Sequence, residues 1–457
     1  MRSPIWVQQA LVAVYGAWWY RRRFNPAFHR IVDEFEQRER CTADQFHAYQ
    51  ATQLATLFGH AAKSAYYKPL LTALDTRDPH TALAKLPFLT KETLRRSATQ
   101  LLTATPPRGT IIQRSSGTTG TPSEIYFTRE LHSFELAVPE ARNLRWAGVD
   151  YRSRRVMFGA RKIARWDQAE PPFWRVNPVE SMAYCSIYHL SPKNMHSYVK
   201  FLAAYHPAVV MGYPASLTTL ASFILENGLR LPSARAVITT SETVTAETRR
   251  LLEQVWGCKV WDRYGAVECC LFASQCEHGR YHVSPDAGLV EIVDAAGKPC
   301  APGVIGEVVA TGLHNMLQPL IRYRLGDAAR WAVDQSCACG RAMPILEAIE
   351  GRFEDICVTP DGREVLRFDT VFKGVATIRE AQVIQRAPDL FHILVIPAAG
   401  FSDADVRTLQ ANMQLHVGDV RTEIVRVTEI PRSSSGKFRA VLCELTAEQK
   451  RGLTGRV

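Results

Sequence analysis

One short segment of the sequence combines the residue types that bind phosphate. Between Arg114 and Ser123, hydroxyl side chains alternate with glycines. Glycine permits close backbone approach, and hydroxyl and N–H groups donate hydrogen bonds to oxyanions. The segment lacks the Gly-Lys-Ser/Thr ending of a Walker A loop. A flexible linker is the alternative, but strand-like runs at 110–112 and 125–127 flank the segment, which favours a loop that wraps a polyphosphate.

Cysteine and histidine recur at a spacing that suits a metal ion. Cys276 and His282 can lie on a hairpin-like pair of strands, and Cys337 and Cys339 form a tight Cys-x-Cys pair. Four N/S ligands with no open position are typical of a structural zinc site that braces a loop. The alternatives are other ligands, or buried cysteines without a metal. The substitute ligands are His278, Cys269 and Cys270.

Composition limits the class of protein and its compartment. The chain has 457 residues, 46% of them apolar and 22% charged, which excludes collagen-like, low-complexity and wholly disordered chains. Eleven cysteines, an odd number, argue against a disulfide scaffold and favour the reducing cytoplasm. A net charge of +10 suits anionic ligands, but it is spread along the chain and does not predict nucleic-acid binding.

The elements that must position these residues change along the chain. Residues 1–100 have the apolar spacing of helices. From about residue 105, strand-like and helical runs alternate, which is the pattern of parallel βαβ units. The strand-like runs are 208–212 and 236–240, and the helical runs are 217–229 and 246–256.

The last third of the chain is richer in strands. Between 280 and 350, strands are expected at 281–283, 289–293, 307–311 and 328–332. Past residue 351, about 105 residues have strands of their own, for example at 382–385 and 391–395. We therefore predict an α/β fold with a large N-terminal domain (1–350, with 1–100 mainly helical) of parallel α/β sheets and a small strand-rich lobe. A small mobile α+β lid domain (351–457) follows.

The N-terminal residues are unusually aromatic. The run from Trp6 to Tyr20 is followed by Arg21, Arg22 and Arg23. The basic cluster lies on the wrong side for a signal peptide, and no run of apolar residues is long enough to cross a membrane. We expect a helix packed on the body of the protein. The alternative is peripheral membrane contact through tryptophan and arginine.

The phosphate-loop segment resembles the signature of the adenylate-forming superfamily, which includes acyl-CoA synthetases, adenylation domains and luciferases. Further segments resemble motifs of the same superfamily, in the same order and over most of the chain. They are Asp262–Glu268, Tyr323–Asp327, Gly351–Asp355 and Pro431–Lys437. The first resembles the Tyr-Gly-x-x-Glu motif, and the third resembles the hinge before the C-terminal domain. The fold and activity that follow are therefore expectations from the resemblance.

The resemblance implies a role for each matching residue. Glu268 would hold Mg²⁺, Asp327 would bind the ribose hydroxyls, and Arg352 would reach the nucleotide. Lys437 would act on the α-phosphate during adenylation. The other ATP-binding residues would be Ser115, Ser116, Gly117, Thr118, Thr119, Gly120, Thr121, Ser241, Glu242, Tyr264 and Gly265.

A finer resemblance is to the phenylacetate-CoA ligase branch, and within it to members from capsule-polysaccharide clusters. It rests on Cys337–Arg341, the segment from Cys276 to His282, the Gly212-Tyr213-Pro214 turn and the segments after the hinge. The sequence also departs from the superfamily.

Val267 replaces the usual threonine or serine before the glutamate, and Ser123 replaces a frequent lysine. The hinge motif contains Glu354-Asp355 and lacks the usual Arg-Gly-x-x-Ile stretch. This difference bears on the second half-reaction, in which the acyl group is transferred.

We expect ATP-dependent activation of a carboxylic acid as an acyl adenylate, with release of pyrophosphate and transfer to CoA. The alternatives are transfer to an amine, a sugar or a carrier protein, and a non-catalytic scaffold relative. An aryl acid is expected because aromatic residues precede the motifs. The predicted pocket residues are Tyr184, Tyr188, Tyr213 and Pro214. The sequence leaves the acid, the acceptor, the pathway and the oligomeric state open.

Overall fold

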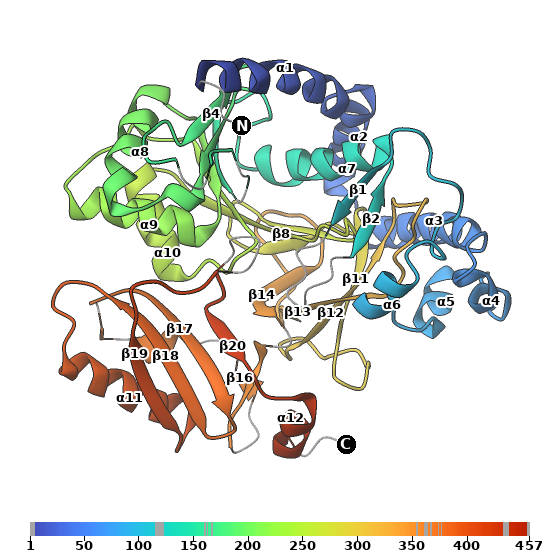
Figure 1. The fold of residues 1–457 in the computed structure, drawn as a ribbon. Helices are drawn as coiled ribbons and strands as arrows, with labels where there is room; N and C mark the ends of the chain where they lie inside the picture. The colour runs from blue at the N-terminus through green and yellow to red at the C-terminus, as the bar shows by residue number, and fades with distance from the viewer. Residues whose placement is uncertain are drawn as a thin grey trace. The chain divides into compact units, whose positions relative to one another are not determined.

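The chain divides into two compact units in the computed structural model (Figure 1). The N-terminal unit comprises residues 1–325 and 329–349, and the C-terminal unit comprises residues 326–328 and 350–457. The structure describes residues 5–114, 123–159, 161, 163–165, 168–352, 355–360, 364–365, 368–372, 374–375, 377–432 and 438–454.

Helices dominate the first hundred residues. They are α1 (Ile5–Arg23), α2 (Pro26–Gln37), α3 (Ala43–Ala61), α4 (Tyr67–Thr72), α5 (Pro79–Lys85) and α6 (Lys91–Arg96). Local sequence explains where they begin. Asn25 accepts a hydrogen bond from the backbone N–H of Phe28 at the start of α2, and Thr42 and Gln45 form a capping box at α3. Their buried faces join one large core with strands from later in the chain.

The N-terminal unit is built on a twelve-stranded sheet in the part of the chain that the structure describes. Its order is β11-β12-β13-β14-β10-β9-β8-β7-β6-β3-β5-β4. The strands are β3 (Arg155–Gly159), β4 (Trp174–Asn177), β5 (Met182–Ser186), β6 (Val209–Gly212), β7 (Ala236–Thr240), β8 (Val260–Gly265), β9 (Phe272–Gln275), β10 (Tyr281–Val283), β11 (Gly288–Val293), β12 (Gly306–Gly312), β13 (Tyr323–Trp331) and β14 (Ile345–Arg352). Strands β1 (Ile111–Arg114) and β2 (Glu124–Phe127) form a separate antiparallel pair.

Strands β5, β3, β6, β7 and β8 run parallel to one another. The connecting helices are α8 (Pro192–Tyr205), α9 (Pro214–Glu226) and α10 (Ala246–Trp256), which Figure 1 shows grouped beside this part of the sheet. Their apolar side chains share a core with the strands. The predicted βαβ units are therefore confirmed. Helix α9 begins three residues before the predicted start because Pro214 occupies its first turn, where proline is favoured.

The predicted α/β fold class is confirmed, and the predicted strand-rich region joins the same sheet as the parallel strands. Strand β8 pairs antiparallel with β9, and this pairing lets β9–β14 extend the parallel strands. The predicted strands at 281–283, 289–293 and 307–311 are present as β10, β11 and β12. The strand predicted at 328–332 begins earlier, at Tyr323, so the Tyr323–Asp327 motif is itself part of β13.

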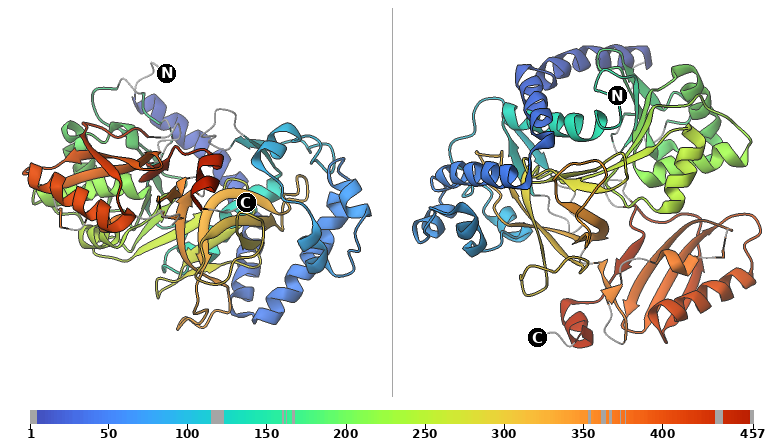
Figure 2. Two further views of the ribbon diagram at one scale, coloured as in Figure 1. Left: turned by 90° about the horizontal axis from the view of Figure 1, so that it is seen from below. Right: turned by 180° about the vertical axis from the view of Figure 1, so that it is seen from behind.

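Two further helical segments complete the N-terminal unit. Helix α7 (Arg129–Pro139) begins with Thr128, whose hydroxyl accepts a hydrogen bond from the backbone N–H of Leu131, and it ends in a π turn over Glu140–Leu144. The 3₁₀ turn Ile187–His189 follows β5. Among the described residues, no helix combines the length and the apolar character needed to cross a bilayer. The views of Figure 2 show α1, α2 and α7 as neighbours.

The C-terminal unit has its own sheet and core. Its four-stranded sheet has the order β19-β18-β17-β20, and α11 contributes buried side chains to its core. The elements are β15 (Cys357–Val358), β16 (Glu364–Val365), a 3₁₀ turn (Asp369–Phe372), β17 (Ile378–Ala387), β18 (Leu390–Pro397), α11 (Asp403–Val417), β19 (Arg421–Arg426), β20 (Val441–Cys443) and α12 (Ala447–Thr454). The strands predicted at 382–385 and 391–395 lie inside β17 and β18.

Candidate active site and metal site

The predicted phosphate loop connects a pair of strands. Strands β1 and β2 are antiparallel partners, with Arg114 opposite Glu124. Ser123 lies fully buried just before β2. The loop residues themselves lie outside the described residues, and their predicted role stays a prediction. They are Ser115, Ser116, Gly117, Thr118, Thr119, Gly120 and Thr121.

Several predicted site residues lie at the carboxyl ends of adjacent parallel strands. Tyr213 follows β6, Ser241 follows β7, and Gly265 ends β8. Strands β6, β7 and β8 are neighbours in the sheet, so these three positions share one edge. Ligands of open α/β sheets bind at this edge. The arrangement therefore forms a candidate binding edge, a name we keep for the carboxyl ends of β6–β8.

Glu242 links two segments at the candidate binding edge. Its carboxylate accepts a hydrogen bond of 2.9 Å from the backbone N–H of Ala215, in the first turn of α9. Tyr213 and Pro214 stand at the start of the same helix. The predicted ATP-binding Glu242 and the predicted pocket residues are thus adjacent. Ser241 has a positive φ of 73°, a conformation that turns the chain sharply after β7.

A buried polar network fixes β8, which carries Tyr264 and Gly265. Asp262 accepts hydrogen bonds from the hydroxyls of Thr239, at 2.6 Å, and Tyr281. Its backbone N–H donates to the side chain of Gln275. Burial raises the pKa of the Asp262 carboxyl, and the two hydroxyls oppose that shift. The network ties β8 to strands on both sides of it.

A hydrogen bond connects the predicted Mg²⁺ ligand Glu268 to Tyr323 of β13. Glu268 follows β8 and is buried, and its Oε1 accepts a hydrogen bond of 3.1 Å from the hydroxyl of Tyr323. A carboxylate held in this way offers the hard oxygen ligand that Mg²⁺ prefers. Asp327 lies within β13, partly exposed, four residues after Tyr323. Val267, where a hydroxyl residue is usual, is also partly exposed.

The predicted acid pocket is described only in part. Tyr184 lies in β5, and its hydroxyl donates to Glu180 Oε2 at 2.8 Å. The guanidinium of Arg161 lies 4.6 Å from the centre of the Tyr184 ring. Tyr188 lies in the 3₁₀ turn after β5 and is exposed.

Sequence reasoning missed a partly buried acid on α7, Glu135. Gln113 in β1 donates a hydrogen bond of 2.9 Å to the carboxylate of Glu135. Burial raises the pKa of Glu135, while the charges of Arg23, Arg263 and Arg161 lower it. One feature of the sequence could have revealed it. Glu135 follows Phe134 on a helix whose surrounding residues are mostly buried. An acid on the buried face of a helix requires polar partners.

In the C-terminal unit, an ion pair lies close in sequence to Lys437. Lys437 lies outside the described residues, and only the backbone of Arg352 is described, at the end of β14. Asp355 forms a bidentate ion pair with Arg439, and one of its bonds is 3.1 Å from Nε. The pair anchors the chain two residues after Lys437. Sequence reasoning named Asp355 in the hinge motif but missed Arg439.

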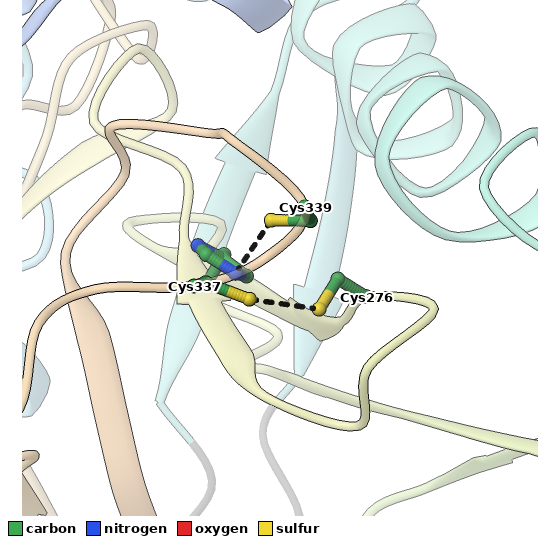
Figure 3. A group of neighbouring side chains, drawn as sticks. Cys276, Cys337 and Cys339 are labelled. Carbon is green, nitrogen blue, oxygen red and sulfur yellow. Dashed lines mark hydrogen bonds between the residues drawn. The ribbon is translucent and has the colours of Figure 1, made fainter.

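The predicted zinc ligands converge in the N-terminal unit (Figure 3). Cys276 follows β9 and His282 lies in β10, and these two strands are antiparallel partners. Cys337 and Cys339 approach from the loop between β13 and β14. The four ligand atoms all lie within 4.8 Å of one another.

The distances suit a tetrahedral ion. Cys276 Sγ and Cys337 Sγ are 3.7 Å apart, and Cys339 Sγ is 3.3 Å from His282 Nε2. A tetrahedral zinc with Zn–S bonds of ~2.3 Å separates two sulfurs by about 3.8 Å. His282 Nδ1 lies 3.2 Å from the carbonyl oxygen of Met343, which leaves Nε2 to face the sulfurs. Burial lowers the pKa of His282, which favours the neutral imidazole that a metal requires.

The alternative ligands lie outside the four-atom group. The backbone N–H of His278 donates to Cys276 Sγ, and its imidazole is not part of the four-atom group. Cys269 and Cys270 are also outside the group.

Basic side chains brace the loop that carries Cys337 and Cys339. The side chain of Arg341 forms ion pairs with Glu39 and Glu277, and its guanidinium lies 4.2 Å from the Trp146 ring centre. Arg40 donates to the carbonyl oxygen of Cys339 at 2.8 Å.

Two family models match the chain. The model described as AMP-binding enzyme matches residues 183–318, which include the candidate binding edge. The model described as CapK C-terminal domain matches residues 357–444 of the C-terminal unit.

Individual proteins are similar over longer stretches. Protein CapK of Staphylococcus aureus is 23% identical over 457 residues, covering 96% of this chain and 97% of that protein. Phenylacetate-coenzyme A ligase of Pseudomonas putida is 27% identical over 291 residues, covering 60% of this chain and 62% of its own length. A solved structure of 2-hydroxyisobutyryl-CoA ligase with 2-HIB-AMP, in the postadenylation state, has a TM-score of 0.68 at 19% identity. The likeness covers 92% of this chain and 94% of that one, and it concerns the fold.

Proposed function

We infer the chemistry from the family, because this chain belongs to the adenylate-forming superfamily, in the phenylacetate-CoA ligase-like branch and close to Protein CapK. It is an adenylate-forming, CoA ligase-like enzyme. We propose that it activates a carboxylic acid with ATP as an acyl adenylate and then transfers the acyl group to CoA. The first step forms a bond between a carboxylate oxygen and the α-phosphorus and releases pyrophosphate. In the second step the CoA thiol attacks the acyl carbon and AMP leaves.

We assign each residue a separate role in the reaction. Mg²⁺, held by Glu268, would neutralise charge on the phosphate oxygens. Asp327 would accept hydrogen bonds from the ribose hydroxyls, and Arg352 would support the nucleotide. Lys437 would place a compact positive charge beside the α-phosphate, a geometry that arginine does not reproduce. Catalysis of this kind depends on positioning and charge stabilisation.

One observation carries the proposal. Residues expected to face nucleotide and acid, from three separate stretches of sequence, stand at the candidate binding edge. The hydrogen bond between Glu242 and Ala215 joins two of these stretches. The AMP-binding enzyme match spans the same segment. A structural scaffold would not need these polar groups at one edge of the sheet.

An aryl or otherwise planar acid is our candidate substrate class. Tyr184 lies in β5, Tyr188 lies in the turn after β5, and Tyr213 directly follows β6 at the candidate binding edge. Aromatic side chains offer flat apolar surfaces for such a group. Transfer to an amine, a sugar or a carrier protein is the alternative second step, since the hinge departs from the usual pattern at Glu354-Asp355.

Carboxylate-dependent exchange of labelled pyrophosphate into ATP tests the first step. A panel of aryl and aliphatic acids should reveal at least one that supports exchange, and aryl acids should be preferred. No exchange with any acid in the panel would favour a non-catalytic scaffold. With the active acid, adding CoA should yield a thioester detectable by mass spectrometry. Exchange without a thioester would redirect the second step to another acceptor.

We also propose a structural zinc ion at Cys276, His282, Cys337 and Cys339. The set supplies four N/S ligands and leaves no position open for chemistry. Purified protein should contain about one zinc per chain, measured by plasma mass spectrometry. The variant Cys339→Ser should lose it, whereas Cys300→Ser, outside the cluster, should not. A wild-type content well below one would remove this proposal.

We place the protein in the cytoplasm. All eleven cysteines are free of disulfide bonds, which suits a reducing compartment. The partners that we propose are small molecules: ATP, the acid and the acceptor.

A further inference from the structure

Helix α1 exposes an apolar stripe. Its members are spaced three or four residues apart, so they share one face of the helix. They are Leu11, Val14, Tyr15 and Trp18, which are 51%, 70%, 61% and 56% exposed. Exposed apolar residues in a contiguous group mark interaction sites more often than isolated ones do.

The opposite face of α1 is packed on the protein. Gly16 lies against β4, where a Cβ atom would come within 2.2 Å of the Asn177 amide. Arg23 forms an ion pair of 2.6 Å with the buried Glu180, and Trp19 contacts the ring of His132 in α7. The helix is therefore fixed in orientation, and its stripe faces away from the elements that hold it. Figure 1 shows α1 along the outer edge of the unit, beside β4 and α7.

A basic hollow adjoins the stripe. It has a volume of about 770 Å³, and it is lined by Trp18, Trp19, Arg22, Arg108, Gly109, Thr110, Ile111 and Arg129. The guanidinium groups of Arg22 and Arg129 both lie near Gly109, within 4 Å of the position that a Cβ atom would take there. Burial and the charge of Arg129 lower the pKa of Arg22. The hollow thus gathers positive charge beside apolar surface.

The neighbouring acids are few and already paired. Helix α1 contains no acidic residue. Glu180 pairs with Arg23, and Glu130 at the start of α7 pairs with Arg30. Arg21 adds a further exposed charge at the end of α1. The surface is therefore complementary to an anionic partner that also has an apolar layer.

We propose that α1 seats this protein on an anionic lipid bilayer. The stripe enters the boundary between headgroups and acyl chains, and the hollow binds lipid phosphate. Interfacial helices combine tryptophan and leucine on one side with arginine beside them in this way. Tryptophan is also favoured at the headgroup level of a membrane. The proposal is independent of the chemistry at the candidate binding edge.

Sedimentation with vesicles tests the proposal on the full-length protein. Binding should be strong on phosphatidylcholine vesicles that contain phosphatidylglycerol, weak on phosphatidylcholine alone, and reduced by salt. The double variant Arg108→Gln/Arg129→Gln should bind the anionic vesicles about fivefold more weakly for each arginine removed. The charge-matched control is Arg407→Gln/Arg421→Gln, which removes two exposed arginines on α11 and β19 and should bind like wild type.

The apolar contribution has its own pair of variants. Tyr15→Ser/Trp18→Ser should lower the partition coefficient at least about tenfold. Val333→Ser/Leu415→Ser removes two apolar side chains that are 76% and 86% exposed elsewhere, and it should have no effect. Circular dichroism melts of every variant would establish that each is folded.

Three outcomes would overturn the proposal. They are equal binding to both vesicle types, equal loss in the control variants, and no binding to either vesicle. A change in oligomeric state on Tyr15→Ser/Trp18→Ser, seen by light scattering without vesicle binding, would instead assign the stripe to a protein partner.

Discussion

At the scale of single residues, Glu268 is the side chain that we propose to bind Mg²⁺. It is buried behind the turn that follows β8, and the Tyr323 hydroxyl donates to its carboxylate. A buried carboxylate is costly unless it is hydrogen-bonded or paired with a positive charge. The hydroxyl therefore orients the oxygen that we assign to Mg²⁺, and it connects this residue to the strand that carries Asp327.

Removing that hydroxyl should weaken the response to magnesium. In Tyr323→Phe, the loss of one hydrogen bond of about 1 kcal/mol should raise the Mg²⁺ concentration for half-maximal exchange about fivefold. The rate at saturating Mg²⁺ should change less. Tyr66→Phe, at a partly buried tyrosine elsewhere in the sequence, serves as the control. An unchanged Mg²⁺ requirement in Tyr323→Phe would argue against the role assigned to Glu268.

Lys437 should be the most sensitive single position. Lys437→Ala should reduce pyrophosphate exchange by about a hundredfold or more, because one preorganised charge at a developing anion is worth that much. Lys437→Arg should be impaired as well. Lys298→Ala, in an exposed turn, should retain wild-type exchange. A normal exchange rate in Lys437→Ala, with normal folding, would refute the assignment.

At the scale of elements, the spacing between neighbouring strands depends on small residues. Gly212 ends β6 where β6 lies beside β3. A Cβ atom there would come within 2.7 Å of the Phe158 carbonyl oxygen and 2.9 Å of the Phe158 Cβ. Any larger residue would push apart the strands that lead into the candidate binding edge. The identity of this residue is therefore set by packing at the end of the strand.

Gly212→Ala should destabilise the N-terminal unit by about 1–3 kcal/mol, the usual cost of overpacking. Gly59→Ala is a matched control, because nothing lies within 4 Å of its added Cβ in α3. The control should be neutral, or more stable by about 0.5–1 kcal/mol, because alanine favours helices. Urea unfolding midpoints compare the two. Equal midpoints would contradict the packing argument.

Acid should loosen the contact between α1 and α7. Burial, together with the charges of Arg23 and Arg22, lowers the pKa of His132 from 6.5 to about 4. As the pH falls, the imidazole is therefore protonated in the unfolded chain before it is protonated in the folded protein. The contribution to the free energy of unfolding that is present above pH 6.5 is lost as the pH falls toward 4. The loss should reach up to about 3 kcal/mol. His132→Phe should remove this part of the pH dependence in urea titrations, whereas an identical profile would show that His132 is not responsible.

Local sequence patterns predicted many elements but not their partners. Strands β6 and β7 were predictable because each is a short apolar run bounded by turn residues. The pairing of β10 with β14 was not, because it joins residues about 60 positions apart and leaves no local signal. The same reason hid the bond from Tyr323 to Glu268 and the pair of Asp355 with Arg439.

The clustering of Cys276, His282, Cys337 and Cys339 was predictable because cysteine and histidine are rare enough for their spacing to be informative. The choice between His278 and His282 was not, since both follow Cys276 closely. Only the β9–β10 pairing places His282 beside the sulfurs.

At the scale of the whole molecule, each unit has a core of its own. The N-terminal unit carries the candidate binding edge and the proposed zinc ligands, and the C-terminal unit contains the ion pair between Asp355 and Arg439. Separate cores allow each unit to fold without the other.

The proposed zinc ligands also lie at the two ends of a long segment of the chain. Cys276 and Cys337 are 61 residues apart, and strands β10, β11, β12 and β13 lie between them. A zinc ion bound by residues at both ends would tether this segment of the chain. By analogy with a disulfide that closes a ring of this size, tethering the unfolded chain would be worth roughly 4 kcal/mol.

Chelation should therefore release one region before the rest. After treatment with a strong chelator, amide hydrogen exchange should accelerate across β11–β13 while β6 and β7 stay protected. Uniform acceleration over the whole sheet, or none, would contradict this expectation. The zinc ion would thus hold β11–β13 in the folded sheet. When zinc is scarce, these strands would unfold separately from the parallel strands.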